Sequence, residues 1–239
     1  MGCMPSRARD GHAGPEMPSS AISGSNQAQS KRELHMFHDI IAQDHEKTAM
    51  ADELQKQVYE GIYLAGKTKK YWVDEKRYNC FMLFPRGLSI AWGEDASYWS
   101  WRNLEDYNDP EVEAAILEEV CWLDIQGKQE LTHLTPGVTY EVVFEVKLTE
   151  PAQGWNMPVN LHLKLPNGTA LQRKENLQEK PREQWLPLKV GEVEAKEELK
   201  WPMEISLFEH GGHWKRGLLI KGIRITPKKV SWKCCDNDH

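Results

Sequence analysis

Apolar side chains occupy every second position in two long stretches of this chain, and that period of two limits the folds the chain can adopt. The stretches cover residues 140–148 and 159–165, and the second leads into Pro166-Asn167-Gly168, where Asn-Gly predicts a hairpin turn. Such alternation is typical of β-strands with one buried face. Residues 203–207 repeat the pattern, and no helical pattern occurs after residue 120. We therefore predict an all-β fold, an antiparallel β-sandwich of jelly-roll type.

Two shorter segments add detail to this prediction. The apolar positions between residues 217 and 225 change parity on either side of Gly222, which predicts a β-bulge at that glycine. Residues 109–119 have a composition that could add one helical turn within the sandwich.

Composition divides the chain into four parts. Residues 1–30 are rich in Gly, Pro, Ser, Ala and Gln, with too few apolar side chains to offset the entropy of ordering, so we expect a disordered arm. Over 31–66 apolar residues recur at three- and four-residue steps, which predicts an amphipathic helical segment that Asp44 could divide in two. Its apolar stripe could pack on the sandwich, on a second copy or on another protein, with the sandwich as the default. The β-sandwich should cover 67–228, and 229–239 form a polar tail.

The charge and the apolar content of the chain narrow the classes of partner and location. A net charge of −6 gives no basic field for phosphate contacts, so we expect no DNA binding and leave RNA open. No apolar stretch is long enough to span a bilayer, and the N-terminus lacks the apolar core of a secretory signal. We expect a cytoplasmic protein.

The sequence contains no motif that indicates catalysis or a metal site. It lacks the nucleophile elbow, the phosphate-binding loop, the dinucleotide fingerprint and the zincin motif, and its histidines are scattered. Five cysteines are an odd number without a CxxC pair, so a zinc site is not expected, and Cys80 and Cys121 fit reduced core thiols. We predict a protein that is not an enzyme, with no catalytic residues, no metal and no cofactor.

Three indoles and a phenol gather within fourteen residues, between Leu88 and Trp101. Trp99 and Trp101 would share one face of a strand, with Tyr98 on the other face and Trp92 seven residues before Trp99. Aromatic faces beside carboxylates suit a sugar, whose C–H groups stack on an indole while its hydroxyls form hydrogen bonds. We expect these four aromatic residues to bind carbohydrate. The alternative is that the indoles belong to the sandwich core, which is the commoner place for any single tryptophan.

One carboxylate, Glu209, continues the apolar parity of residues 203–207 to the end of their strand. An unpaired buried carboxylate is costly, so Glu209 should reach the rim of the sandwich or find a donor. At the rim it could accept a hydrogen bond from a sugar hydroxyl or acetamido group. The alternative is an ion pair with Lys215 or Arg216 across the following hairpin. A glycosidase would need a second, opposed carboxylate, and no spacing ties one to the aromatic cluster.

Four segments together resemble the plant phloem protein 2 family, the Nictaba-related lectins. They read YWVDEKRYNCFMLFPRGLSIAWGEDASYWSW, CWLDIQGKQELTHLTPGVTYEVVFEVKL, GWNMPVNLHLKLPNG and LFEHGGHWKRGLLIKGIRITPK, and they follow the order of the family between Lys69 and Lys228. By motif, Trp92 and Trp99 match the family's two sugar-site tryptophans, and Glu209 matches its acidic residue. Tyr98 and Trp101 are additions from the argument on aromatic faces.

The resemblance implies a non-catalytic lectin that binds N-acetylglucosamine oligomers and the chitobiose core of N-glycans, acts in the phloem or in defence, and forms a homodimer. The basic cluster that serves some relatives as a nuclear signal is replaced here by ENLQEKPREQ, so nuclear import is open. The rival hypothesis is a protein-interaction or RNA-trafficking factor of the phloem with little sugar binding, which uses the helical segment at 31–64 as its docking surface.

The first six residues, Met-Gly-Cys-Met-Pro-Ser, fit the pattern for N-myristoylation. Gly2 would be the acceptor after removal of the initiator methionine, and Cys3 offers an adjacent palmitoylation site. Two acyl chains anchor a protein stably, whereas one does so only marginally. We therefore expect a tether to the inner leaflet of the plasma membrane through Gly2 and Cys3. The alternative is a chance match of a short motif.

Overall fold

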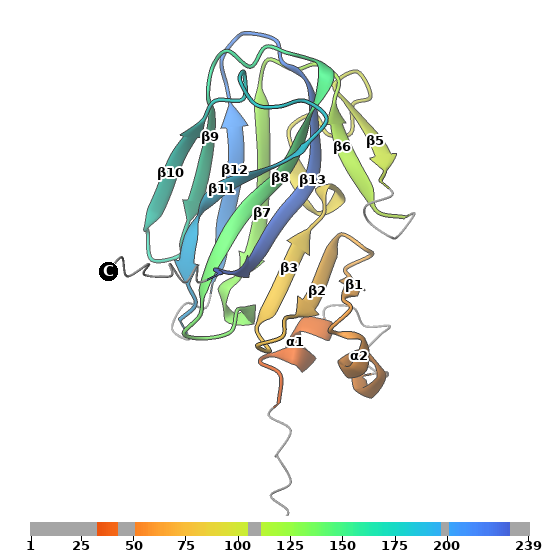
Figure 1. Ribbon diagram of the computed structural model, residues 1–239, viewed down its shortest axis with the longest axis vertical. Helices are drawn as coiled ribbons and strands as arrows, with labels where there is room; N and C mark the ends of the chain where they lie inside the picture. Colours follow the sequence, from red (N-terminus) through yellow and green to blue (C-terminus); the bar gives the residue numbers. More distant parts are fainter. Residues whose placement is uncertain (1–32, 43–50, 105–110, 197–200, 230–239) are drawn as a thin grey trace, which may run out of the picture. The chain divides into compact units, whose positions relative to one another are not determined.

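Eight strands form the jelly-roll arrangement that the alternating pattern predicts (Figure 1). Four of them lie side by side in the order β3-β13-β8-β11, and the other four in the order β7-β12-β9-β10. Because the chain passes back and forth between these two sets and all of these pairings are antiparallel, the predicted all-β sandwich of jelly-roll type is confirmed.

In the part of the chain that the structure describes, the two sheets contain thirteen strands. The large sheet contains β1 (Ile62–Leu64), β2 (Lys69–Val73), β3 (Asn79–Leu83), β5 (Trp99–Asn103), β6 (Glu113–Leu117), β8 (Thr139–Gln153), β11 (Trp185–Glu194) and β13 (Arg216–Pro227). The small sheet contains β4 (Ser89–Ile90), β7 (Leu123–Glu130), β9 (Val159–Lys164), β10 (Ala170–Glu175) and β12 (Pro202–Glu209).

This computed structural model describes residues 33–42, 51–104, 111–196 and 201–229, all in one unit that begins at Glu33. The predicted arm over 1–30, residues 230–239 of the predicted tail and the acylation sites Gly2 and Cys3 lie outside the described residues. Within the described ranges, no helix has the length and apolar character of a membrane span. The same ranges contain no group of three or more His, Cys, Asp or Glu placed to hold a metal ion.

The core lies between the two sheets and is built from the alternating positions. Tyr140, Phe144 and Leu148 on β8 are completely buried, as are Leu161 and Leu163 on β9. Burying the apolar side chains between the sheets stabilises the fold, because the free energy gained scales with the apolar area removed from water. The alternation therefore fixes which face of each strand turns inward.

The predicted bulge at Gly222 is confirmed. The pairing of β13 with β8 shifts register between Ile220 and Gly222, where the backbone φ of the glycine is 146°. A Cβ atom at this position would lie 2.3 Å from the carbonyl oxygen of Leu83 on β3, so a larger residue would clash with the neighbouring strand.

The helical segment expected over 31–66 is shorter than that range. The structure contains α1 (Phe37–Ile41) and α2 (Ala51–Gln57), and residues 62–64 form β1, which pairs with β2. Asp44 lies outside the described residues. The apolar Ile62 and Leu64 fit a period of two as well as a helical period, and the turn that follows them, at positive φ, closes a hairpin instead of continuing a helix. The sandwich domain thus begins before residue 67.

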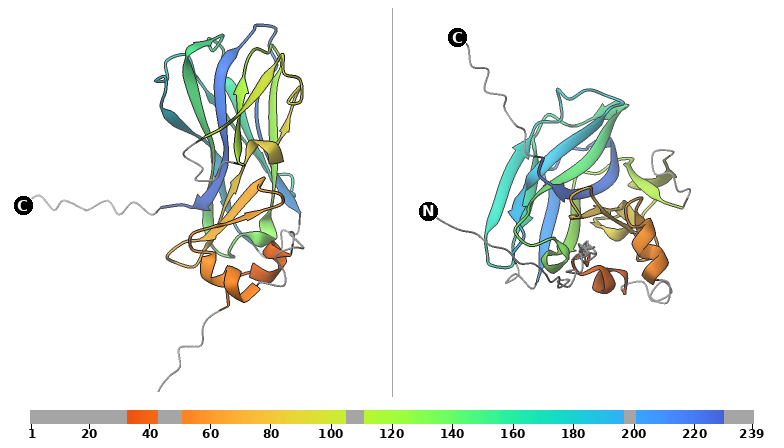
Figure 2. Two further views of the ribbon diagram at one scale, coloured as in Figure 1. Left: turned by 90° about the vertical axis from the view of Figure 1, so that its right-hand side faces the viewer. Right: turned by 60° about the horizontal axis from the view of Figure 1, so that its bottom comes forward.

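The apolar stripe of this helical segment packs on the sandwich, which was the default of the three options. Its described members are buried in the main core, and they are Leu34, Phe37, Ile40, Ile41, Leu54 and Val58. Figure 2 shows both helices against the end of the sandwich where β2 and β3 meet. A partner protein therefore has no access to these described members of the stripe in the folded domain.

The helical turn expected within 109–119 is wrong. Residues 113–117 form β6, which pairs with β5 and with β13. The Ala and Glu content of this segment favours a helix locally, but this preference is worth only about a few tenths of a kcal/mol per residue. Pairing with the two neighbouring strands outweighs it.

A buried amide joins the first helix to the sandwich. The side-chain amide of Asn79 donates hydrogen bonds to the carbonyl oxygens of His35 and His133, both at 2.8 Å. Its oxygen accepts a hydrogen bond from the Tyr71 hydroxyl at 3.0 Å, and its backbone N–H donates to the Thr135 hydroxyl at 3.0 Å. All polar groups of Asn79 named here are thus satisfied inside the protein, as burial requires.

The His133 side chain is expected to make the stability of the domain depend on pH. Burial, together with the charge of Lys69, lowers the pKa of His133 from 6.5 to about 4. Because the unfolded chain binds this proton at a higher pH than the folded chain, the folded state loses stability as the pH falls from about 6.5 towards 4. The loss between pH 7.5 and 5.0 should be about 2 kcal/mol. Urea unfolding at both pH values tests this, and His133→Leu should remove most of the difference; a variant with an unchanged difference would contradict it.

Candidate functional site

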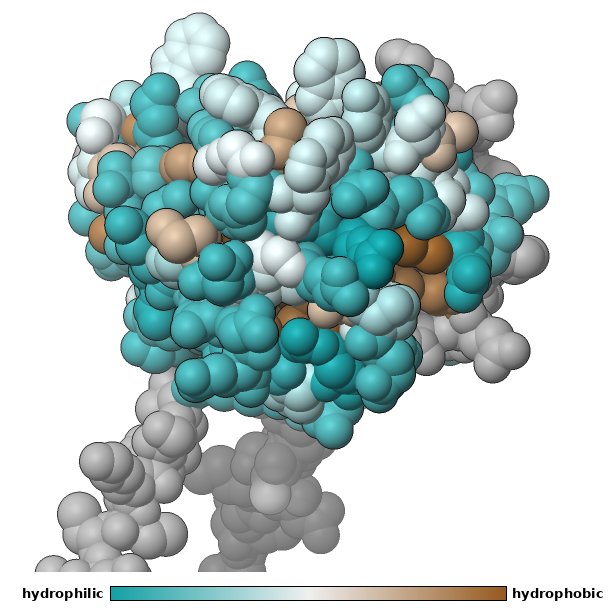
Figure 3. Space-filling model, turned by 90° about the horizontal axis from the view of Figure 1, so that it is seen from above, coloured by the Kyte–Doolittle hydropathy of each residue, from teal (hydrophilic) through white to brown (hydrophobic). Residues whose placement is uncertain are grey.

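Three exposed indoles lie at the end of the sandwich where β7 begins and β12 ends. Trp92, Trp122 and Trp214 have exposed fractions of 60%, 49% and 54%. The backbone N–H of Ala91 donates to the carbonyl of Asp124 at 2.9 Å, which joins the Trp92 turn to β7. An antiparallel bridge between Val120 and Lys215 joins the segments that carry Trp122 and Trp214. Figure 3 views this end of the molecule, where pale side chains of intermediate hydropathy lie among hydrophilic ones. We call it the indole end.

Trp122 has a fixed orientation because His210 stacks on it. The two rings are almost parallel, with centroids 3.9 Å apart and an interplanar angle of 6°. Nε2 of His210 lies 2.9 Å from Oδ2 of Asp124, so a carboxylate on the neighbouring strand holds the imidazole in place. One face of the indole is covered by His210, and with about half of the side chain exposed the indole can offer its remaining surface to a ligand.

The aromatic surface continues across the outer face of the small sheet. The Phe208 ring lies 4.9 Å from the His210 ring and 4.9 Å from the His162 ring. Phe208 lies on β12, His210 directly follows β12, His162 lies on β9 and Trp122 precedes β7, so the row of rings crosses the small sheet beside the indole end. The aromatic cluster at 88–101 gave no indication of this row. Trp122, Phe208 and His210 did have a signal in the sequence, since each takes the parity opposite to the buried residues of its strand.

Trp92 lies in a tight turn that exposes its side chain to solvent. Its backbone has a φ of 63°, and the N–H of Gly93 donates to the carbonyl of Ile90 at 3.0 Å. The Tyr98 ring lies 5.9 Å from the indole at an angle of 51° and is half-buried beneath the same loop. Of the four aromatic residues predicted to bind sugar, these two are therefore brought together, and the indole of Trp92 is exposed.

Trp99 and Trp101 support the loop from below. Trp99 has an exposed fraction of 1%, and its Nε1 donates to the carbonyl of Ala91 at 3.0 Å. Trp101 is half-buried, its Nε1 donates to the carbonyl of Gly93 at 3.2 Å, and the guanidinium of Arg86 lies 3.6 Å from its ring. The expectation that a sugar stacks on Trp99 is thus corrected, because no face of that indole is accessible. The core alternative describes Trp99, and both indoles position the turn that carries Trp92.

Glu209 forms the ion pair that was its alternative role. Its Oε2 lies 2.5 Å from Nζ of Lys215, and its Oε1 accepts a hydrogen bond from the N–H of Gly211 at 2.8 Å. His213 Nε2 lies 3.4 Å from the same carboxylate. Burial by itself would raise the pKa of Glu209, but Lys215, the Gly211 amide and His213 together hold that pKa below its ordinary value. The carboxylate is therefore charged and engaged by protein groups.

Lys215 connects the two loops that carry Trp122 and Trp214. It is buried, and besides Glu209 its ammonium donates to the carbonyl of Cys121 at 2.7 Å and to that of His213 at 3.0 Å. With three acceptors the ammonium is fully satisfied, which a buried charge requires. The ion pair thus holds the backbone of both loops in place. Glu209 therefore supports the indole end by positioning this backbone.

Known proteins match this chain over most of the sandwich. The family model described as Phloem protein 2 matches residues 78–227. The Arabidopsis thaliana protein named PHLOEM PROTEIN 2-LIKE A1 is 47% identical over 180 residues, which are 74% of this chain and 73% of that protein. A protein of Luffa acutangula named Lectin is 42% identical over 179 residues, 74% of this chain and 85% of that protein. Among solved structures, the CBM22-1 xylan-binding domain of Paenibacillus barcinonensis Xyn10C has a TM-score of 0.37 and 12% identity, over 62% of this chain and 90% of that one. On the match to the family model and the two sequence relatives, this chain is a member of the phloem protein 2 family.

Proposed function

We propose that this protein is a non-catalytic lectin that binds N-acetylglucosamine oligomers, including the chitobiose core of N-glycans, at the indole end. The observation that carries the proposal is the group of three exposed indoles, Trp92, Trp122 and Trp214, on loops held by buried hydrogen bonds and an ion pair. A relative at 42% identity bears the name Lectin, which supports the same class of ligand.

The indole end suits a sugar because its aromatic surfaces are held in place before any ligand arrives. A pyranose ring can stack its C–H groups on Trp122, whose other face is covered by His210, and on Trp92. The loops need little ordering on binding, which lowers the entropic cost of association. Backbone groups and polar side chains around the indoles would then form hydrogen bonds with the hydroxyl and acetamido groups of the sugar.

The state of Glu209 supports a binding role over a catalytic one. A glycosidase acid needs a raised pKa so that it can donate a proton, with a second carboxylate opposite. The pKa of Glu209 is shifted downward and its oxygens contact Lys215 and the Gly211 amide. We propose that Glu209 serves the lectin by holding the loop that carries Trp214, instead of accepting a hydrogen bond from the sugar.

Truncation of the exposed indoles tests the proposal. Trp92→Ala and Trp122→Ala should each weaken the binding of chitotriose by about 1–2 kcal/mol or more, since stacked rings in partly dry sites contribute at that level. Isothermal titration calorimetry of the full-length protein measures the effect. Trp201→Ala is the matched control, because Trp201 is 72% exposed and precedes the opposite end of β12. Wild-type affinity in both variants, with the fold intact, would show that the indole end is not the sugar site.

The rival function, a partner-docking factor, is not favoured by any contact in the described residues. The apolar stripe that was to dock the partner is buried against the sandwich. Homodimer formation, a role in phloem or defence, RNA binding and a cytoplasmic location stay predictions. Acylation of Gly2 and Cys3, with the plasma-membrane tether that it would provide, also stays a prediction.

A further inference from the structure

A groove of about 980 Å³ lies at the end of the sandwich opposite the indole end. Its walls come from the turn after α2, the hairpin between β2 and β3, the start of β8 and the end of β13. Strand β13 runs from Arg216 beside the indole end to Pro227 in the wall of the groove. At about 3.3 Å per residue, the two regions are roughly 35 Å apart. A ligand in this groove is therefore out of reach of the indole end.

Three aromatic side chains from separate segments line the groove. Tyr59 follows α2 and is 50% exposed, whereas Trp72 on β2 and Tyr78 before β3 are half-buried. Partly exposed aromatic rings within a concavity give a ligand apolar surface on which to stack, and polar side chains line the same groove.

Main-chain hydrogen bonds give the groove its shape in the free protein. The N–H of Val73 donates to the carbonyl of Val58 at 3.1 Å, which joins the Tyr59 turn to β2. Oδ1 of Asp74 accepts hydrogen bonds from the N–H groups of Lys76 at 2.9 Å and Tyr78 at 2.8 Å. These bonds fix the hairpin that carries two of the three aromatic lining residues, Trp72 and Tyr78, so the site is largely preformed.

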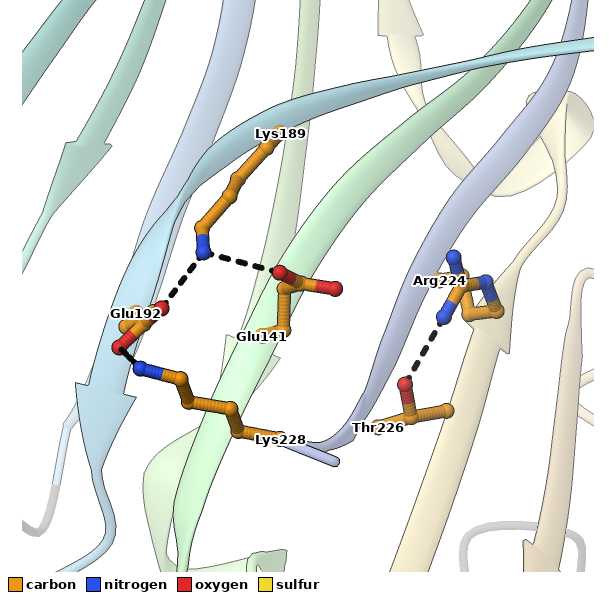
Figure 4. Close-up of polar contacts among 6 residues, drawn as sticks. All are labelled: Glu141, Lys189, Glu192, Arg224, Thr226 and Lys228. Atoms are coloured by element: carbon orange, nitrogen blue, oxygen red, sulfur yellow. Dashed lines mark hydrogen bonds and ion pairs between the residues drawn. The ribbon is translucent and has the colours of Figure 1, made fainter. Parts of the chain in front are cut away.

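The charges along the groove compensate one another. Its lining includes two carboxylates and three ammonium groups, those of Asp74, Glu75, Lys76, Lys228 and Lys229. Lys228 Nζ lies 2.8 Å from Oε2 of Glu192, whose other oxygen is 2.5 Å from Nζ of Lys189, and Lys189 also pairs with Glu141 at 2.9 Å (Figure 4). One of the three ammonium groups that line the groove, that of Lys228, is therefore already paired with Glu192. Because this leaves little net charge, the groove favours an uncharged ligand with polar edges over an anionic polymer.

We propose that this groove is a second carbohydrate-binding site, which takes a neutral oligosaccharide by stacking on Tyr59 and Trp72. The class of sugar rests on the proposed lectin function, whereas the position rests on the groove itself. One chain then binds two glycans at opposite ends of its sandwich. Such a chain cross-links glycoproteins without forming a dimer, because two linked sites give bivalent binding on their own.

Calorimetry with full-length protein and chitotriose tests this site. The wild type should bind two molecules of chitotriose per chain. Tyr59→Ala should weaken one of the two events at least about fivefold and leave the other unchanged, because the stacking ring is lost. Tyr59→Phe keeps the ring and should bind like the wild type, and Trp201→Ala again serves as the control, since that exposed indole lines neither site. Trp122→Ala should weaken the other event only.

The arms of this experiment separate the groove from the indole end. If the wild type binds one chitotriose per chain and Tyr59→Ala binds with the same affinity, the groove is not a sugar site and the proposal for the indole end is unaffected. Loss of binding on Tyr59→Ala with no effect of Trp92→Ala or Trp122→Ala supports the groove and overturns the indole end. No binding to the wild type overturns both sites.

Discussion

Replacing Lys215 by methionine is expected to lower the free energy of unfolding by about 3–5 kcal/mol, the usual cost of removing one partner of a buried ion pair. The methionine fills most of the same volume, so the loss comes from charge and hydrogen bonding. Glu209 would keep its buried charge without the ammonium now 2.5 Å away, and the carbonyls of Cys121 and His213 would lose their donor. Urea unfolding at pH 7 measures the change.

Two further variants show that the effect belongs to this pair. Adding Glu209→Leu to Lys215→Met should recover part of the lost stability, because no unpaired charge then stays buried. Lys189→Met is the matched control for a lysine in a more exposed network on the large sheet, and it should cost at most about 1 kcal/mol. A Lys215→Met protein within about 1 kcal/mol of wild type would contradict the buried role of the pair.

The ion pair also makes a testable link between stability and the proposed function. Lys215 and Glu209 hold the backbone that carries Trp122 and Trp214, so breaking the pair should loosen both indoles. Lys215→Met protein that is still folded should therefore bind chitotriose more weakly than wild type, although neither charged group faces the sugar in our proposal. Rigid loops lose little conformational entropy when a ligand binds. The substitution would loosen the loops and so raise this entropic cost of binding.

The strands could be predicted from the sequence wherever one face is buried and the other is solvated, because burial itself imposes the period of two. The prediction failed for residues 62–64 and 113–117, whose short apolar runs fit a helix equally well. Their state is decided by pairing with β2 in one case and with β5 and β13 in the other, and these contacts are distant in sequence. The packing of the helical stripe also depends on distant contacts. No local pattern could decide whether it packs on the sandwich, on a second copy or on another protein.

The candidate site could be predicted only in part, for a similar reason. Spacing alone placed Trp99 and Trp101 on one face of a strand, but it could not tell that this face turns towards the 91–93 turn and away from solvent. Trp122 and His210 come from segments nearly ninety residues apart, and only the pairing of β7 with β12 brings their rings together. Parity pointed both residues outward, whereas their stacking depends on the fold.

Trp99→Ala is expected to cost about 3–5 kcal/mol of stability, as truncation of a large buried aromatic side chain usually does. Trp99 is among the largest fully buried side chains, and its indole N–H satisfies the carbonyl of Ala91, so the variant would leave both a cavity and an unpaired acceptor. Trp99→Phe should recover much of the packing but not the hydrogen bond. Trp92→Ala should show the opposite behaviour, with near wild-type stability and weak binding, because Trp92 is exposed.

Unfolding curves and chitotriose titrations on these three variants separate support of the loop from contact with the sugar. If Trp99 supports the loop, binding falls together with stability, and Trp99→Phe recovers part of both. If Trp99 contacts the sugar directly, Trp99→Ala keeps wild-type stability and loses binding, which would contradict its buried position at the base of the turn. The comparison therefore decides whether Trp92 alone stacks on the sugar while Trp99 holds its turn in place, as the burial of Trp99 indicates.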